Sequence, residues 1–382
     1  NNKNSSMQFS QIIGQDIIKQ QLITSVREGR IPHAQLFLGQ EGVGKLALAI
    51  AYAQYVSCLN KGKHDSCGTC SSCIKYEKLI HPDLHMVFPF AKDGKTKEIC
   101  DDLLPEWREF VTKNVYFSLE QWMDNIGAGN KQATIYANES NEILRKLQLT
   151  TYESAYKIMI IWLPEKMNIT CANKLLKILE EPPTKTLFIL VSEQVEKIIS
   201  TIISRTQMIK IPLIETHTMS SYLQAKHSIS KENSINIARI ANGNYIKALS
   251  IIKATEESQL NFTRYQEIMR YAYKNDVLAT KKWAEEMTSS SMGREKQKSF
   301  LDYAQHITRE CFIKNIEINE LNYLIDYEEN FSSGFARFVN EKNIQALMDF
   351  FADAATDIEQ NVQGKFVFFD LGLKLMTQIK QN

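Results

Sequence analysis

The segment LFLGQEGVGKLAL, residues 36–48, has the glycine spacing and the lysine of a phosphate-binding loop. An apolar run that predicts a strand ends in Gly39, and an alanine-rich stretch that predicts a helix begins at Lys45. Backbone N–H groups freed by Gly39, Gly42 and Gly44 can point at phosphate oxygens, and Lys45 can reach the outer phosphates. A nucleotide site is one interpretation. The other is that the glycines only allow a tight turn.

Positions that a hydrolytic site needs carry apolar residues instead. Leu46 stands where the loop pattern has Ser or Thr to place a hydroxyl on Mg2+. The apolar strand YKIMIIWLP would end in an acidic pair in an ATPase, but these positions are Trp162 and Leu163. Glu165 is expected to be an exposed residue at a helix start. The chain should therefore not hydrolyse ATP, and whether it still binds ATP or ADP stays open.

A cluster of cysteines points to a metal. Its two Cys-x2-Cys steps let neighbouring thiolates reach one tetrahedral ion, and four thiolates close a structural Zn2+ site. A redox pair and an iron–sulfur cluster are the alternatives. The predicted ligands are Cys58, Cys67, Cys70 and Cys73. The isolated Cys100, Cys171 and Cys311 are expected to be small buried residues.

Alternating helices and strands must position these groups. The stretch NKLLKILEEPP predicts an amphipathic helix that Pro182 and Pro183 stop, and an apolar strand follows at 187–191. The next stretch carries Ser204 and Arg205 at the end of a further helix. This alternation predicts a doubly wound α/β domain.

The segment 91–132 reads as an insertion of one or two short helices on the edge of this core. It carries several aromatic residues, which we expect to form a satellite core. Anchoring a partner is the alternative. These residues are Trp107, Tyr116, Phe117 and Trp122.

Composition limits the class of protein. The chain has 382 residues, long enough for two or three domains. Its 45 Lys and Arg against 44 Asp and Glu argue against a protein that coats nucleic acid through bulk positive charge. No run is apolar enough for a membrane helix or a signal peptide. We expect a cytoplasmic protein, in which the residues before Met7 are an added or disordered extension.

Together, IIGQDIIKQQLITSVREGRIPHAQLFLGQEGVGK, the cysteine cluster, NKLLKILEEPP and TIISRTQ resemble the delta-prime subunits of bacterial DNA polymerase III clamp loaders. The resemblance covers about residues 8–90 and 140–255. It implies an AAA+ core at 1–214 with an inserted zinc module at 58–73, a helical lid at 215–257 and a helical collar at 258–382.

In that family the subunit joins delta and the ATP-hydrolysing gamma or tau subunits in a ring that loads the sliding clamp onto primed DNA. The resemblance implies that Arg205 is an arginine finger aimed at a neighbour's nucleotide. Thr206 stands where the family often has Cys, and Arg205 could instead only compensate a helix C-terminus. Ile246 replaces an arginine that senses nucleotide in active members.

Two further classes of function remain. An active ATPase resembling the gamma subunit is opposed by Leu46, Trp162 and Leu163. A zinc-containing nucleic-acid-binding protein is opposed by the near-neutral charge.

Overall fold

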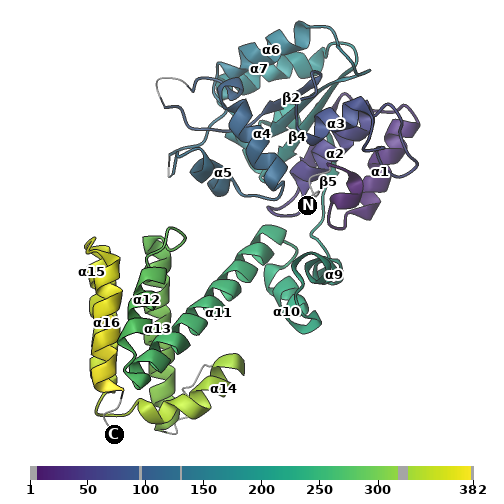
Figure 1. The fold of residues 1–382 in the computed structure, drawn as a ribbon. Coiled ribbons are helices and arrows are strands. Elements are labelled where there is room, and N and C mark those ends of the chain that lie inside the picture. The colour runs from purple at the N-terminus through teal and green to yellow at the C-terminus, as the bar shows by residue number, and fades with distance from the viewer. Residues whose placement is uncertain (1–6, 94–96, 130, 317–325, 380–382) are drawn as a thin grey trace. The chain divides into compact units, whose positions relative to one another are not determined.

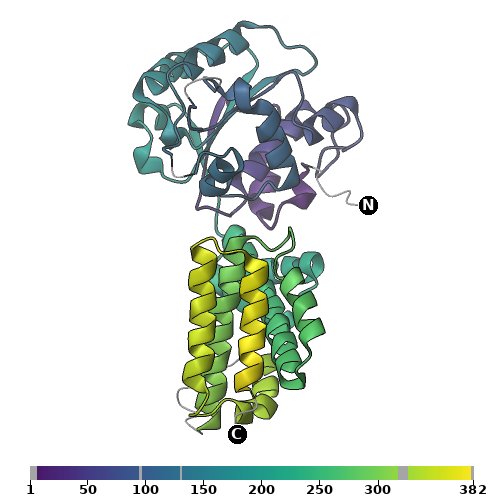
Figure 2. The same ribbon diagram turned by 60° about the vertical axis from the view of Figure 1, so that its left-hand side comes forward.

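The computed structural model describes residues 7–93, 97–129, 131–316 and 326–379, so the expected extension at 1–6 lies outside the described residues. Its contacts divide the chain into two compact units, Asn1–Ile251 and Ile252–Asn382. The first is built around a sheet (Figure 1), and the second is helical wherever it has regular structure in its described part (Figure 2). No helix among the described residues is both long and apolar enough to cross a membrane.

The sheet of the first unit is parallel and has the strand order β2-β3-β4-β1-β5. Strand β1 pairs with β4 on one side and β5 on the other, so Leu38 lies beside both Ser192 and Lys210. The predicted α/β core is confirmed. The sequence analysis predicts three of these strands but neither β2 nor β5. The strand bounds are β1 Ala34–Leu38, β2 Leu84–Val87, β3 Lys157–Trp162, β4 Thr186–Ser192 and β5 Gln207–Lys210.

Helix α2 lies at the centre of this unit. Every one of its 13 residues is buried, and it packs against β1, β3 and β4. Helix α7 ends at Glu180, just before the prolines expected to stop it. The helices of the first unit are α1 Asp16–Arg27, α2 Lys45–Ser57, α3 Ser71–Glu77, α4 Leu104–Lys113, α5 Leu119–Asn125, α6 Glu139–Gln148, α7 Ile169–Glu180, α8 Ser200–Ile203, α9 Thr216–His227 and α10 Lys231–Ala241.

The predicted insertion at 91–132, of which 94–96 and 130 are not described, forms α4 and α5. Trp107 and Trp122 are fully buried, so partner anchoring is wrong for these two side chains. Trp107 stacks on Phe88, which follows β2, with ring centroids 4.1 Å apart, and meets Trp162 at the end of β3. The insertion is therefore continuous with the main core and not a separate cluster at its edge.

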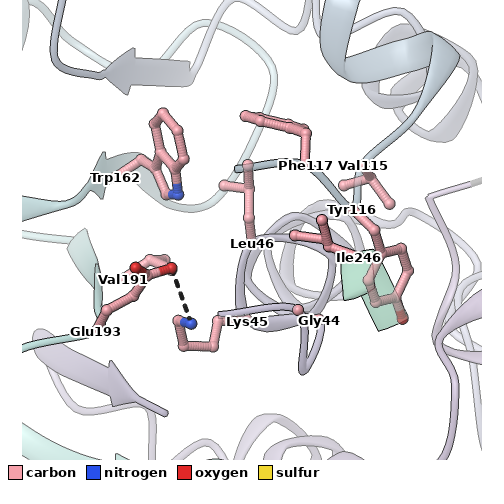
Figure 3. Close-up of a pocket in the computed structure, with 11 residues that line it drawn as sticks. Gly44, Lys45, Leu46, Val115, Tyr116, Phe117, Trp162, Val191, Glu193 and Ile246 are labelled. Atoms are coloured by element: carbon pink, nitrogen blue, oxygen red, sulfur yellow. Dashed lines mark hydrogen bonds and ion pairs between the residues drawn. The ribbon is translucent and has the colours of Figure 1, made fainter. Parts of the chain in front are cut away.

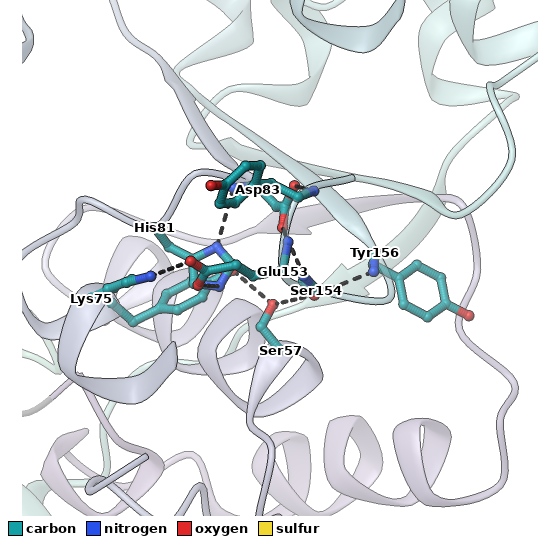
Figure 4. Close-up of polar contacts among 9 residues, drawn as sticks. Ser57, Lys75, His81, Asp83, Glu153, Ser154 and Tyr156 are labelled. Carbon is teal, nitrogen blue, oxygen red and sulfur yellow. Dashed lines mark hydrogen bonds and ion pairs between the residues drawn. The ribbon is translucent and has the colours of Figure 1, made fainter. Parts of the chain in front are cut away.

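A buried carboxylate anchors the loop before β3 (Figure 4). Asp83 accepts hydrogen bonds from the backbone N–H groups of Tyr152, Glu153 and Ser154 at 2.7–2.8 Å. Burial alone would raise the pKa of Asp83, but these three donors hold it below its ordinary value. The charged carboxylate thus ties the start of β2 to the start of β3.

Long helices build the second unit, with α15 packed against both α13 and α16 (Figure 2). Aromatic side chains such as Tyr265, Phe300, Phe351 and Phe368 are fully buried between them. The predicted division into lid and collar stays a prediction. The helices, the first of which begins in the preceding unit, are α11 Tyr245–Lys274, α12 Val277–Glu286, α13 Arg294–Asn315, α14 Asp326–Phe335, α15 Ile344–Glu359 and α16 Gly364–Gln378.

Candidate functional site

The predicted phosphate loop connects β1 to α2, the strand–loop–helix arrangement that the motif requires. Gly42 and Gly44 have φ of 76° and 90°, in the left-handed region that favours glycine. A Cβ on Gly39 would lie 2.6 Å from the Ile211 carbonyl oxygen. All three glycines are therefore required by the backbone, whether or not a phosphate binds.

Lys45, at the start of α2, is turned inward (Figure 3). Its Nζ donates to the Gln40 carbonyl oxygen and lies 3.4 Å from a Glu193 carboxylate oxygen. Burial lowers the pKa of Lys45, and the Glu193 carboxylate opposes this effect. The lysine that would bind phosphate thus already has an anionic partner within the chain.

The side chains at the positions that would serve Mg2+ and the attacking water are apolar, and in the structure they lie together. Leu46 and Trp162 line one cavity, together with Ile246 from the start of α11. Among the described residues that line it, Glu193 alone carries a carboxylate. That carboxylate faces Lys45. The cavity therefore lacks the hydroxyl–carboxylate pair that holds Mg2+ in phosphate-loop NTPases.

The expectation of an exposed Glu165 is wrong. Glu165 lies in a short 3-10 helix, Pro164–Lys166, but it is half-buried, and one carboxylate oxygen accepts the Glu193 backbone N–H at 2.9 Å. Burial raises its pKa. The turn after β3 directs the Glu165 side chain back to the end of β4. Its hydrogen bond to the Glu193 backbone N–H links the two strand ends.

The space left between these side chains is small. The cavity measures about 20 Å³, enough for about one water molecule, whereas sites for small molecules span roughly 300–1,000 Å³. The cavity is therefore much smaller than a site for a nucleotide, and whether the loop binds ATP or ADP stays open.

The four cysteines of the predicted metal site converge. Their sulfur atoms all lie within 4.8 Å of one another. The Cys58–Cys67 and Cys67–Cys73 sulfur distances are 3.6 and 3.9 Å, close to the roughly 3.8 Å edge of a tetrahedron with Zn–S bonds of about 2.3 Å. They are far too long for disulfides. The donor set therefore fits a tetrahedral metal ion.

Local structure favours thiolates at part of this cluster. Backbone N–H groups of Thr69 and Cys70 lower the pKa of Cys67 to about 6, and similar donors lower that of Cys70 despite its burial. Burial raises the pKa of Cys58 and Cys73. Cys100, Cys171 and Cys311 are buried apart from this cluster, as predicted.

Arg205 follows α8, as predicted, one residue beyond Ser204. One guanidinium nitrogen donates to the Thr201 carbonyl oxygen at 2.9 Å, and the other pairs with the Glu180 carboxylate. Its side chain is 33% exposed. The structure does not bring Arg205 into the cavity beside Lys45, whose lining residues do not include it.

Sequence reasoning missed the partners of two of these groups. Glu180 and Glu193 carry no local signal, because only the fold brings them to Arg205 and Lys45. Tyr116 and Phe117 were visible only as aromatic residues of an insertion, yet both line the cavity.

Comparisons with known proteins show which family the chain belongs to. A family model described as DNA polymerase III, delta subunit, matches residues 14–215. Subunit delta' of Bacillus subtilis (strain 168) is 28% identical over 250 residues, covering 65% of this chain and 63% of that protein. Subunit gamma of Buchnera aphidicola subsp. Acyrthosiphon pisum is also 28% identical over 250 residues, covering 64% and 58%. Subunit tau of B. subtilis is 26% identical over 249 residues, covering 64% and 37%.

The matches thus span less than two thirds of the length of each of these relatives. The family model, however, covers more than half of this chain. The chain therefore belongs to the DNA polymerase III delta-subunit family of clamp-loader proteins.

Proposed function

We propose that this chain is a delta-prime-type subunit of a DNA polymerase III clamp loader, which does not hydrolyse ATP and which supplies Arg205 to a neighbouring subunit. It would assemble with gamma or tau and delta subunits in the cytoplasm. Through that assembly it would help to place the sliding clamp on primed DNA.

The observation that carries the proposal is the apolar character of the catalytic positions. Leu46 and Trp162 can neither bind Mg2+ nor accept a proton, and the cavity beside them has room for about one water molecule. ATP hydrolysis needs both a bound metal and a positioned water. A subunit built in this way contributes shape and contacts, not turnover.

Arg205 is suited to act across an interface. It is partly exposed and outside the cavity of its own chain. A guanidinium keeps its charge and offers a planar fork to phosphate oxygens. Placed beside the γ-phosphate of a neighbour, it would stabilise the charge that develops during hydrolysis.

The metal at the four cysteines is proposed to be structural Zn2+, since four thiolates leave no open position for catalysis. It would order the segment from Cys58 to Cys73. That segment in turn fixes the start of the described chain, because the Asp65 carboxylate accepts the backbone N–H groups of Phe9 and Ser10. Residues 215–257 would then serve as the lid and 258–382 as the collar through which subunits assemble.

Mixing the purified chain with delta and gamma subunits, followed by size-exclusion chromatography and assays of ATPase activity and clamp loading, tests this role. We expect a stable complex that loads clamps and a free chain without ATPase activity. Failure to enter the complex would contradict the proposal.

The second candidate, an active ATPase resembling gamma, is favoured by the retained Lys45 and by the similarity to gamma and tau subunits. ATP turnover by the free chain that disappears in Lys45→Ala would support it instead.

A further inference from the structure

The short segment Asn114–Ser118, between α4 and α5, lies against the phosphate loop. The Tyr116 hydroxyl oxygen lies 2.8 Å from the point where Gly44 would carry a Cβ. Tyr116 and Phe117 are both buried, and they line the same cavity as Lys45 and Leu46 (Figure 3). The chain's own aromatic rings thus take up space next to the loop that a bound nucleotide would need.

Local hydrogen bonds hold this segment in one conformation. The Asn114 side chain donates to the Tyr116 carbonyl oxygen at 2.6 Å and accepts the Tyr116 backbone N–H at 3.1 Å. Ser118 begins the next helix with a reciprocal capping arrangement that involves Gln121. Both polar groups of the Tyr116 backbone are therefore satisfied while its side chain points inward.

Tyr116 connects three parts of the first unit. Its hydroxyl accepts the Ile13 backbone N–H at 3.1 Å, and its ring meets Tyr245 edge-on, with centroids 5.0 Å apart. The Tyr245 backbone N–H in turn donates to the Gly42 carbonyl oxygen at 3.1 Å. A bound ligand would have to break this set of contacts to reach the loop.

Phe117 fits the apolar side of the site. Its ring contacts Trp162 at 5.1 Å and Trp107 at 5.7 Å between centroids. A carboxylate at position 162 would lie against these apolar rings, an unfavourable environment for a charge. The replacement of an acidic residue by Trp162 and the position of Phe117 are therefore complementary.

The charge of the loop is also neutralised from within the chain. Glu193 lies 3.4 Å from Lys45 Nζ, the group that would otherwise bind phosphate. The aromatic rings thus fill space that a ligand would fill, and the Glu193 carboxylate takes the place of a negatively charged phosphate beside Lys45.

We propose that residues 114–118 are a built-in occupant of the nucleotide site, and that this segment, more than the altered loop, prevents binding of a nucleoside diphosphate. The glycine conformations and Lys45 at the helix start are intact beneath it. Removing the two rings should therefore open a site for ADP. This inference does not depend on the role of the chain in a clamp loader.

The test is a titration of the full chain with fluorescent N-methylanthraniloyl-ADP, followed by anisotropy. The unmodified chain should show no saturable binding, which sets a detection limit. Tyr116→Ala/Phe117→Ala should bind it with an affinity at least about tenfold above that limit, and adding Lys45→Met to this variant should abolish the binding. Phe110→Ala is the matched control, because Phe110 packs on Phe117 and Trp122 but does not line the cavity, so it should gain no binding.

Circular dichroism and metal content establish that each variant is folded. If the double variant does not fold, Phe117→Ala alone keeps the hydrogen bond between Ile13 and Tyr116 and should still gain measurable binding. Stoichiometric ADP binding by the unmodified chain, or a folded double variant that binds no better, would overturn the proposal.

Discussion

The guanidinium of Arg205 is paired with the carboxylate of Glu180, the last residue of α7. The two residues come from the two stretches, NKLLKILEEPP and TIISRTQ, that carry much of the resemblance to delta-prime subunits. Their contact joins the proline-stopped helix to the proposed finger. Both side chains are partly exposed, so the pair itself should add at most about 1 kcal/mol to stability.

Arg205→Ala should leave folding, metal content and complex assembly unchanged and lower ATP hydrolysis by the assembled loader at the neighbouring site by at least about tenfold. Arg205→Lys should not restore the rate, because an ammonium lacks the planar fork. Steady-state ATPase assays with clamp and primed DNA measure this. An unchanged rate would leave Arg205 only a role at the end of α8.

Glu180 should act as a positioning residue for the finger. Without it, the bonds of the Arg205 side chain to Thr201 and Ser204 remain among the described residues. We expect Glu180→Ala to lower kcat of the assembled loader, by less than Arg205→Ala does, with KM for ATP unchanged. Glu181→Ala changes the adjacent carboxylate, for which no ion pair with Arg205 is found among the described residues, and should have no effect. Equal losses in both variants would contradict this role.

One zinc ion per chain is expected, since the four thiolates close a tetrahedral set. Elemental analysis should find zinc near one equivalent in the unmodified chain and almost none in Cys70→Ser. That variant should lose the order of the segment from Cys58 to Cys73 and keep the parallel sheet. A red-brown chromophore with iron in place of zinc would establish an iron–sulfur cluster instead.

Lys45→Ala should not change ATP turnover, because the free chain should have none to lose. It should instead lower the free energy of unfolding by about 2–4 kcal/mol, since it leaves the partly buried Glu193 without its ionic partner. Urea unfolding measures the second effect and a coupled-enzyme assay the first. A Lys45→Ala chain of unchanged stability would show that the internal pair is weak.

His85, on β2, should make the fold sensitive to acid. Burial, with Lys146 and Lys157 nearby, lowers its pKa to about 4. Between the ordinary value and about pH 4 the unfolded chain binds a proton that the folded chain does not, so stability is lost as pH falls through this window, by about 2–3 kcal/mol. Urea unfolding should show that His85→Gln reduces the loss and that the exposed His217→Gln does not. Parallel pH profiles for all three chains would refute this assignment.

Much of the core could be predicted because its signals are local. The continuous apolar runs of β3 and β4 identify strands buried on both faces, and the prolines after α7 mark its end. The short β5 mixes exposed and buried residues in its four positions, as an edge strand does, and offers no such run. Strand β2, also of four residues, is too short to offer such a run.

In the candidate site, too, some features could be predicted from the sequence and others could not. Leu46 and Trp162 could be interpreted from their place in two motifs. The contact of Lys45 with Glu193, and of Gly44 with Tyr116, joins residues far apart in the chain. Local patterns carry no information about such pairs, so the closure of the site became visible only with the fold.

The strand order also delays completion of the sheet during synthesis of the chain. Among the described residues, strand β1 pairs only with β4 and β5, which are translated roughly 150 residues later, a delay on the order of 10 s or more at ~5–20 residues per second. During that interval β1 and α2 leave the ribosome without the later strands that they pack against in the finished fold. The nascent chain should therefore bind general chaperones until Lys210 has emerged, whereas the helices of the second unit can form as they are made.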